Sequence, residues 1–219
     1  MTRYVLVPGA WHGAWAFDAV SDALSREGHE VQALTLSGLG DEPVAGVNLE
    51  RHIDDVVQAI RASDGLVVLA GHSYGGMVIT GAADRLSTRI QALVYVDAYV
   101  PNSGESTWSL TSPAYRDRFI KGAAFDGMSC TPEARTDPRR RPHPMACFLQ
   151  AIELAGLWRR VRRKAFVAAH GWEGSPFVDL YARLELDPEW ATYSLDCAHD
   201  VPRLAPEALT GILLRCAQE

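Results

Sequence analysis

The sequence predicts an α/β protein with a mostly parallel sheet of about six strands and helices on both faces. Three observations support this. Short apolar runs alternate along the chain with longer segments of helical periodicity, as in successive strand–helix–strand units. The apolar runs are nearly continuous, which is typical of parallel strands buried on both sides. The 219 residues are enough for one such domain with a substantial core.

The first half of the chain keeps this alternation without interruption. Gly28 is expected to stop the first helix. Asn48 can cap the second helix, in which Ile53, Val56 and Ile60 share one face. The expected order is strand 3–7, helix 15–26, strand 30–36, helix 49–62, strand 66–70, helix 75–86 and strand 90–96.

The alternation breaks at residues 101–158, where Pro, Gly, Ser and Arg are scattered around two helical stretches, 113–120 and 145–157. We interpret this segment as a helical lid insertion that folds over the sheet edge. The core of the single domain then comprises residues 1–100 and 159–219. Its last part is expected to contain strand 165–169, helix 176–186, strand 191–195 and helix 206–217.

A serine directly follows the third predicted strand. The residues Gly71-His72-Ser73-Tyr74-Gly75 form a G-x-S-x-G motif between a strand and a helix, which is the setting of a nucleophile elbow. The two glycines let the backbone bend tightly. The N-terminus of the following helix directs partial positive charge at the hydroxyl. We therefore predict that Ser73 is a nucleophile.

A serine nucleophile needs a base within hydrogen-bonding reach, and histidine is the usual one. His199 follows the last predicted strand, at the edge where the carboxyl ends of parallel strands meet. It is the predicted base, with His170 after the fifth strand as a weaker alternative. His72, inside the elbow, is interpreted as a packing residue.

The carboxylate that orients the histidine is less clearly marked. Asp97 stands at the end of the fourth strand after an apolar run, where an unpaired carboxylate is costly. The loop after the fifth strand contains Glu173 but no aspartate before Asp179. We predict Asp97 as the acid and Glu173 as the alternative, and Asp179, Asp196 and Asp200 stay open.

Backbone N–H groups are expected to form the oxyanion hole. One belongs to Tyr74, and the second to Ala10 or Trp11 in the glycine-rich loop after the first strand. An apolar or aromatic substrate pocket is expected from Trp11, His12, Trp108 and Phe148. Two basic runs, 139–141 and 159–164, are placed near the lid, either as solvated surface or as an attraction for an anionic substrate.

Composition and charge narrow the function classes. The net charge of −6 argues against nucleic acid as a partner. No apolar stretch reaches the roughly 18 residues of a membrane span, and the chain opens into a strand with no signal-peptide pattern, so we expect a cytoplasmic protein. No cluster has metal-ligand spacing, and neither metal nor cofactor is expected. A homodimer stays open. Four widely spaced cysteines are expected as free thiols: Cys130, Cys147, Cys197 and Cys216.

The motifs resemble those of a known family. Residues 5–15, 71–76, 94–101 and 198–200 are similar to the α/β-hydrolase superfamily, and most of all to the branch that contains plant methylesterases, salicylate-binding esterases and hydroxynitrile lyases. The resemblance implies the α/β-hydrolase fold. It also implies the roles of four residues: Ser73 as nucleophile, His199 as base, and Ala10 and Tyr74 as oxyanion donors.

One departure concerns the acid. The loop after Ala169 lacks the aspartate that most of this branch carries. Haloalkane dehalogenases and some lipases of the superfamily place their acid after the preceding strand, which is where Asp97 stands. The resemblance therefore agrees with the choice of Asp97.

These features predict a serine hydrolase that cleaves a carboxylic ester, lactone or thioester of a small, partly apolar substrate through an acyl-enzyme. Two alternatives stay open. One is a lyase or cyclase on the same scaffold, in which Ser73 and His199 serve as acid and base. The other is a ligand-binding protein with little turnover.

Overall fold

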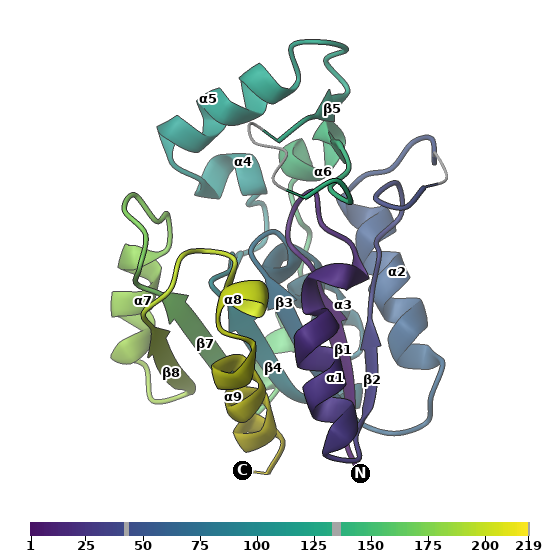
Figure 1. Ribbon diagram of the computed structural model, residues 1–219, viewed down its shortest axis with the longest axis vertical. Coiled ribbons are helices and arrows are strands. Elements are labelled where there is room, and N and C mark those ends of the chain that lie inside the picture. The colour runs from purple at the N-terminus through teal and green to yellow at the C-terminus, as the bar shows by residue number, and fades with distance from the viewer. Residues whose placement is uncertain (42–43, 133–136, 219) are drawn as a thin grey trace.

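The computed structural model describes residues 1–41, 44–132 and 137–218, and a parallel sheet forms their centre (Figure 1). Six strands stand in the order β2-β1-β3-β4-β7-β8, and every neighbouring pair is parallel. The predicted fold class is confirmed. The strands are β1 (Arg3–Val7), β2 (Glu30–Ala33), β3 (Val67–His72), β4 (Ile90–Val96), β7 (Arg163–Ala169) and β8 (Trp190–Leu195).

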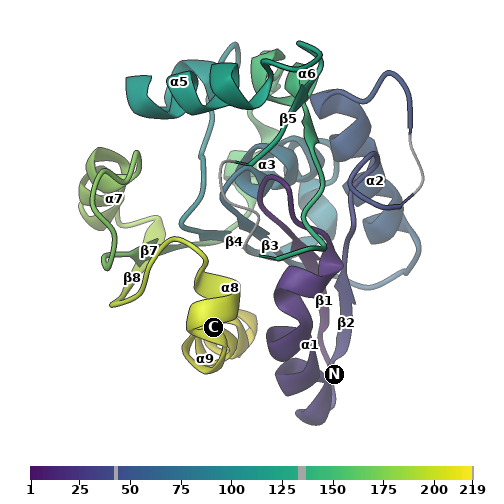
Figure 2. The same cartoon turned by 45° about the horizontal axis from the view of Figure 1, so that its top comes forward.

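Alternate side chains of the strands enter two hydrophobic cores, one on each face of the sheet. Val5 and Leu69 belong to one core, whereas Leu6 and Val68 belong to the other. The first core is covered by α2 (Leu49–Arg61), α3 (Gly75–Arg85) and α7 (Val178–Glu185). The second is covered by α1 (Asp18–Arg26), α8 (Val201–Leu204) and α9 (Pro206–Gln218), and Figure 2 shows α1 and α9 on the same side of the sheet.

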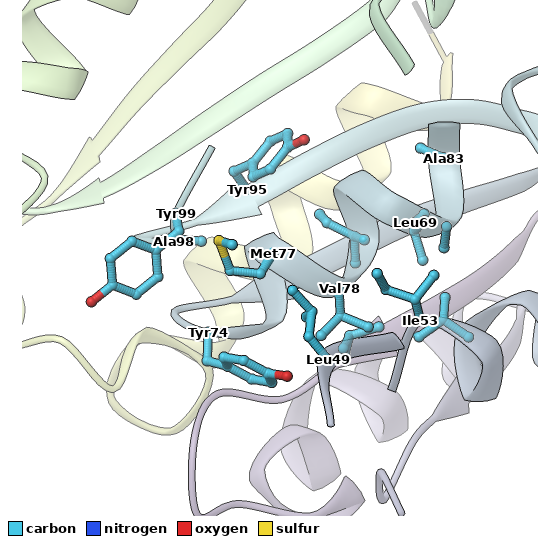
Figure 3. Packing of buried hydrophobic residues seen from close by; sticks show 14 of the residues in the cluster. Leu49, Ile53, Leu69, Tyr74, Met77, Val78, Ala83, Tyr95, Ala98 and Tyr99 are labelled. Carbon is cyan, nitrogen blue, oxygen red and sulfur yellow. The ribbon is translucent and has the colours of Figure 1, made fainter. Parts of the chain in front are cut away.

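The packing of α3 fixes the helix that follows the elbow. Met77 and Val78 of α3 lie in one buried cluster with Leu49 and Ile53 of α2 (Figure 3). The two helices can approach closely because Gly81 has no side chain. A Cβ at this position would lie only 2.4 Å from Ile53 Cδ1. The N-terminus of α3 is thereby held against the end of β3, where Ser73 stands.

Residues 101–158 form short elements beyond the carboxyl ends of the strands (Figure 1). These are α4 (Thr107–Leu110), α5 (Pro113–Gly122), β5 (Ser129–Cys130), β6 (His143–Pro144) and α6 (Met145–Leu149). β5 and β6 pair as a small antiparallel sheet. Residues 133–136 of the predicted lid, and residue 219 of the predicted core, lie outside the described residues.

Two predicted elements are shorter in the structure. The strand expected at 30–36 ends at Ala33, and Leu36 is apolar because it packs into the first core. The helix expected at 145–157 ends at Leu149, after which the chain is extended. In that stretch the N–H of Ile152 donates to the Glu105 carbonyl, so its apolar residues serve packing between loops.

The basic runs also differ from the expectation. Lys164 is the second residue of β7, near the opposite end of that strand from Ala169, and its buried ammonium pairs with Glu189 at 3.0 Å. The run 159–164 is therefore divided, because Arg159 donates to Asn102 Oδ1 at 2.9 Å and lies over the Trp158 ring, whereas Lys164 is buried in the sheet. In the other run only Arg140 lines the central cavity, while Arg139 pairs with Asp137 and Arg141 with Asp41.

Candidate active site

The turn after β3 presents Ser73 in a left-handed conformation, with φ of 53°. Glycine is required around it. A Cβ at Gly75 would lie 2.7 Å from the Val7 carbonyl oxygen, and one at Gly76 would lie 2.1 Å from the Tyr99 carbonyl oxygen. The sequence G-x-S-x-G-G thus lets the backbones of β1 and of the loop after β4 approach the elbow.

Three side chains that are distant in sequence meet at this edge of the sheet. Ser73 Oγ lies 2.8 Å from His199 Nε2, and His199 Nδ1 lies 2.7 Å from Asp97 Oδ2. A carboxylate oxygen can only accept, so Nδ1 carries the proton and Nε2 is free to accept the serine hydroxyl proton. The structure thus brings together the predicted nucleophile, base and acid in one chain of hydrogen bonds, Ser73–His199–Asp97, which we call the relay.

Asp97 is buried, with 1% of its surface exposed. Its Oδ1 accepts the Ala169 N–H of β7 at 3.1 Å, while Oδ2 accepts from His199, so the buried charge has two donors. Asp97 also has a positive φ of 43°, which turns its side chain from the end of β4 toward β7 and β8. This turn lets a carboxylate that follows β4 reach His199, which follows β8.

The alternative candidates lie elsewhere. Glu173 is exposed, and its carboxylate makes no hydrogen bond to the described residues. The backbone of the loop that carries Glu173 contacts the segment that carries His199, since Gly171 N–H donates to the Cys197 carbonyl at 2.9 Å. His170 packs edge-on against Tyr181, with ring centroids 5.0 Å apart. Neither side chain is placed to replace Asp97 or His199 in the relay.

His72 does more than fill space. Its Nε2–H donates to the backbone carbonyl of His199 at 2.8 Å, and the two rings are 4.7 Å apart. Burial and the neighbouring His199 lower the pKa of His72 well below its ordinary range, so it stays a neutral donor. Trp172 lies against another part of the His199 ring, with centroids 4.6 Å apart.

Two backbone N–H groups flank the serine. Among the described residues, neither the Ala10 nor the Tyr74 N–H has a hydrogen-bond partner. The Trp11 N–H, by contrast, donates to His143 Nδ1 at 3.4 Å. Of the two residues that the sequence left open for the second oxyanion donor, Ala10 is therefore the one whose N–H is available.

The relay opens into a cavity of about 380 Å³ that the described residues line. Of the predicted pocket residues, Trp11, His12 and Phe148 line the cavity. Trp108, on α4, does not, and its ring lies under the guanidinium of Arg116. Phe119 and Phe148 stack with centroids 4.3 Å apart. Tyr115, and Arg140 of the basic run 139–141, also line the cavity, together with Tyr99 and Arg118, which the sequence did not mark.

Behind the elbow lie three buried side chains whose donor atoms are within 4.8 Å of one another: His52, His143 and Cys147. They fit a hydrogen-bonded network better than a metal centre. His52 Nε2–H donates to the Ser37 carbonyl, and its Nδ1 accepts from the Tyr74 hydroxyl. Burial raises the pKa of the Cys147 thiol to about 12, so the thiol is protonated within this network.

The sequence matches the model of the alpha/beta hydrolase family over residues 4–212. The chain belongs to this family. It is 37% identical to the carbendazim hydrolyzing esterase of Nocardioides sp., over 92% of this chain and 93% of that protein. Methylesterase 2 of Arabidopsis thaliana is 34% identical, but the match spans 48% of this chain and 42% of the plant enzyme.

Solved structures show the same fold. An extracellular α/β-hydrolase from a Paenibacillus species matches with a TM-score of 0.86 and 20% identity, over 100% of both chains. A pyrethroid hydrolase from Sphingobium faniae matches with a TM-score of 0.81 and 20% identity, over 99% of this chain and 97% of that one. No helix among the described residues is long and apolar enough to cross a membrane.

The family and its esterase members confirm the prediction of an ester-cleaving hydrolase. They also confirm the resemblance to the methylesterase-like branch. The sequence analysis missed the residues that contact Trp11 in the loop after β1, which are Cys130, Arg141 and above all His143. Nothing in its local sequence marks it, because its partner Trp11 is 132 positions away.

Proposed function

We propose that this hydrolase cleaves carboxylic esters of small aromatic or partly apolar substrates through an acyl-enzyme on Ser73. The observation that carries the proposal is the relay Ser73–His199–Asp97, which ends at a cavity with two unengaged backbone N–H groups. A nucleophile, a base with a fixed tautomer and an oxyanion hole are the parts that acyl transfer needs.

The chemistry follows from the hydrogen bonds. Ser73 Oγ attacks the ester carbonyl while His199 Nε2 takes its proton, and Asp97 stabilises the imidazolium through Nδ1–H. The Ala10 and Tyr74 N–H groups receive the oxyanion. His199 then returns the proton to the departing alcohol, which leaves an acyl group on Ser73. Water, deprotonated by the same Nε2, releases the acid and regenerates the hydroxyl.

The cavity supports a planar, apolar substrate part. Its volume of about 380 Å³ suits a small molecule. One wall is aromatic, with Phe119 and Phe148 stacked against each other and Trp11 beside them. The esterase relatives favour hydrolysis over the lyase, cyclase and ligand-binding alternatives.

A fluorophosphonate probe tests the mechanism. We expect labelling of folded protein at one residue, Ser73, located by peptide mass spectrometry, and loss of labelling in Ser73→Ala. A panel of p-nitrophenyl and methyl esters, with acetyl, benzoyl and naphthoyl groups and with carbendazim added, then ranks the substrates. Labelling without turnover of any ester would refute hydrolysis, and absent labelling would refute the acyl-enzyme.

The cytoplasmic location and a homodimer are part of the same proposal. Fractionation of the producing cells tests the first. Size-exclusion chromatography with light scattering tests the second directly, because a dimer has twice the mass of the 24.0 kDa chain.

A further inference from the structure

Trp11 has a backbone conformation that its residue type disfavours. It has a φ of 67°, and it is the third residue of the turn closed by His12 N–H and the Gly9 carbonyl at 3.3 Å. Turns with a positive φ at this position normally carry glycine or asparagine there. A tryptophan at positive φ is strained by roughly 1–2 kcal/mol, so other contacts must hold it.

The hydrogen bonds among those contacts come from Cys130, Arg141 and His143, while Phe119 and Phe148 add ring contacts. The Trp11 carbonyl accepts the Arg141 N–H at 3.0 Å, and the Trp11 N–H donates to His143 Nδ1 at 3.4 Å. The indole Nε1–H donates to the Cys130 carbonyl at 2.7 Å. Every hydrogen-bonding group of this one residue is thus engaged by the segment around β5 and β6.

His143 also reaches the other side of the oxyanion hole. Its ring is fully buried and stacks on Phe148, with centroids 4.5 Å apart and planes within 11°. It meets the Tyr74 ring edge-on at 4.6 Å. One side chain therefore touches Tyr74, one of the two proposed oxyanion donors, and Trp11, the neighbour of the other donor, Ala10.

The turn fixes where the Ala10 N–H points. His12 N–H holds the Gly9 carbonyl, and His12 Nδ1–H holds the Ala10 carbonyl at 2.8 Å. In a trans peptide the N–H lies opposite the carbonyl of the same plane. Because Gly9 directs its carbonyl toward His12, the Ala10 N–H points the other way. The orientation of this donor depends on the turn, and the turn depends on the conformation of Trp11.

We propose that His143 is a positioning residue of the oxyanion hole, and that Cys130, Arg141 and His143 together hold the Trp11 turn in the geometry that directs the Ala10 N–H at the reacting oxygen. This inference rests on the proposed function. It gives part of the segment predicted as a lid a fixed role in transition-state stabilisation, beyond covering the cavity.

His143→Phe tests the role without opening a cavity. Phenylalanine keeps the stack on Phe148 and removes the Nδ1 acceptor, together with a buried Nε2 that lacks a partner among the described residues. Loss of the unpartnered Nε2 favours the folded state, whereas the Trp11 N–H loses its acceptor, so we expect the melting temperature to change little. We expect kcat to fall about tenfold or more while KM stays within about twofold, because an oxyanion donor acts in the transition state.

Two further measurements separate positioning from general damage. The affinity for an aryl trifluoromethyl ketone, whose adduct with serine carries an oxyanion, should fall by the same factor as kcat. His143→Asn, whose side-chain oxygen can replace Nδ1 as acceptor, should recover most of kcat. His29→Phe is the matched control, since His29 Nδ1 accepts the Thr2 N–H beside Tyr4, far from the site.

The outcomes are distinguishable. Wild-type kcat in His143→Phe, or a loss shared by His29→Phe or expressed in KM, would overturn the positioning role. If His143→Phe does not fold, Trp11→Phe removes the indole donor and should lower the affinity for the ketone relative to the affinity for the product acid. Absent fluorophosphonate labelling of the wild type would instead overturn the proposed function, and with it this inference.

Discussion

The sheet edge and residues 101–158 build one site in two different ways. At the sheet edge, regular strands end at Ser73 and Asp97, and glycines allow the backbone contacts that hold these residues. Apart from the helix α5, the described part of residues 101–158 contains elements of five residues or fewer, and it contributes the aromatic wall of the cavity and the hydrogen bonds to Trp11. The chemistry thus depends on the regular part of the fold, and the shape of the pocket depends on the irregular part.

Substitution of Asp97, the acid at the sheet edge, should have the largest effect on kcat. Asp97→Asn keeps the shape of the side chain but loses the charge that fixes the His199 tautomer, so kcat should fall by about 10⁴-fold. Glu173→Gln, in the exposed loop after β7, should leave kcat unchanged. Steady-state kinetics on one ester measures both. A larger loss in Glu173→Gln than in Asp97→Asn would move the acid to the other loop.

The glycines of the elbow should be the most sensitive positions for folding. In Gly76→Ala the new Cβ would meet the Tyr99 carbonyl oxygen, a backbone atom, so we expect a loss of about 3 kcal/mol in the free energy of unfolding. Gly65→Ala is the control, because no atom lies within 4 Å of its added Cβ. Urea unfolding compares them. Equal stability of the two variants would contradict the close approach of the loop after β4.

The same contrast explains what the sequence could predict. Ser73, His199 and Asp97 each follow an apolar strand, and parallel strands bring their ends together whatever the details of packing. The relay between Ser73 and His199 was therefore predictable although the two are 126 positions apart. The hydrogen bonds of Trp11 were not, because they depend on the path of an irregular segment that no periodicity describes.

Buried histidines where the two regions meet should make stability depend on pH. Burial lowers the pKa of His12 to about 4, against the attraction of Asp200. The unfolded chain protonates the same side chain near pH 6.5, so acidification favours unfolding. At about 1.4 kcal/mol per pH unit, His12 alone should cost about 2 kcal/mol between pH 6.5 and pH 5.

Urea unfolding at these two pH values measures the effect, and His12→Gln provides the comparison. The variant cannot titrate, so its stability should fall less than that of the wild type over the same interval. Burial also lowers the pKa values of His52, His72 and His143, which should leave a residual dependence of the same sign. An identical pH dependence in wild type and variant would show that His12 is protonated in the folded protein.

The aromatic wall should give the smallest effect and the most selective one. Phe119→Leu removes the ring that stacks on Phe148 while keeping an apolar side chain of similar reach. An aromatic contact between the benzoyl ring of the substrate and Phe119 contributes about 1 kcal/mol beyond its buried area, so kcat/KM for benzoyl esters should fall about fivefold when the Phe119 ring is lost. Acetyl esters, which have no ring to stack, should be cleaved at the wild-type rate because the relay is untouched. A parallel loss for both esters would mean that Phe119 supports the sheet edge as well, and that the two regions are less separate in function than in structure.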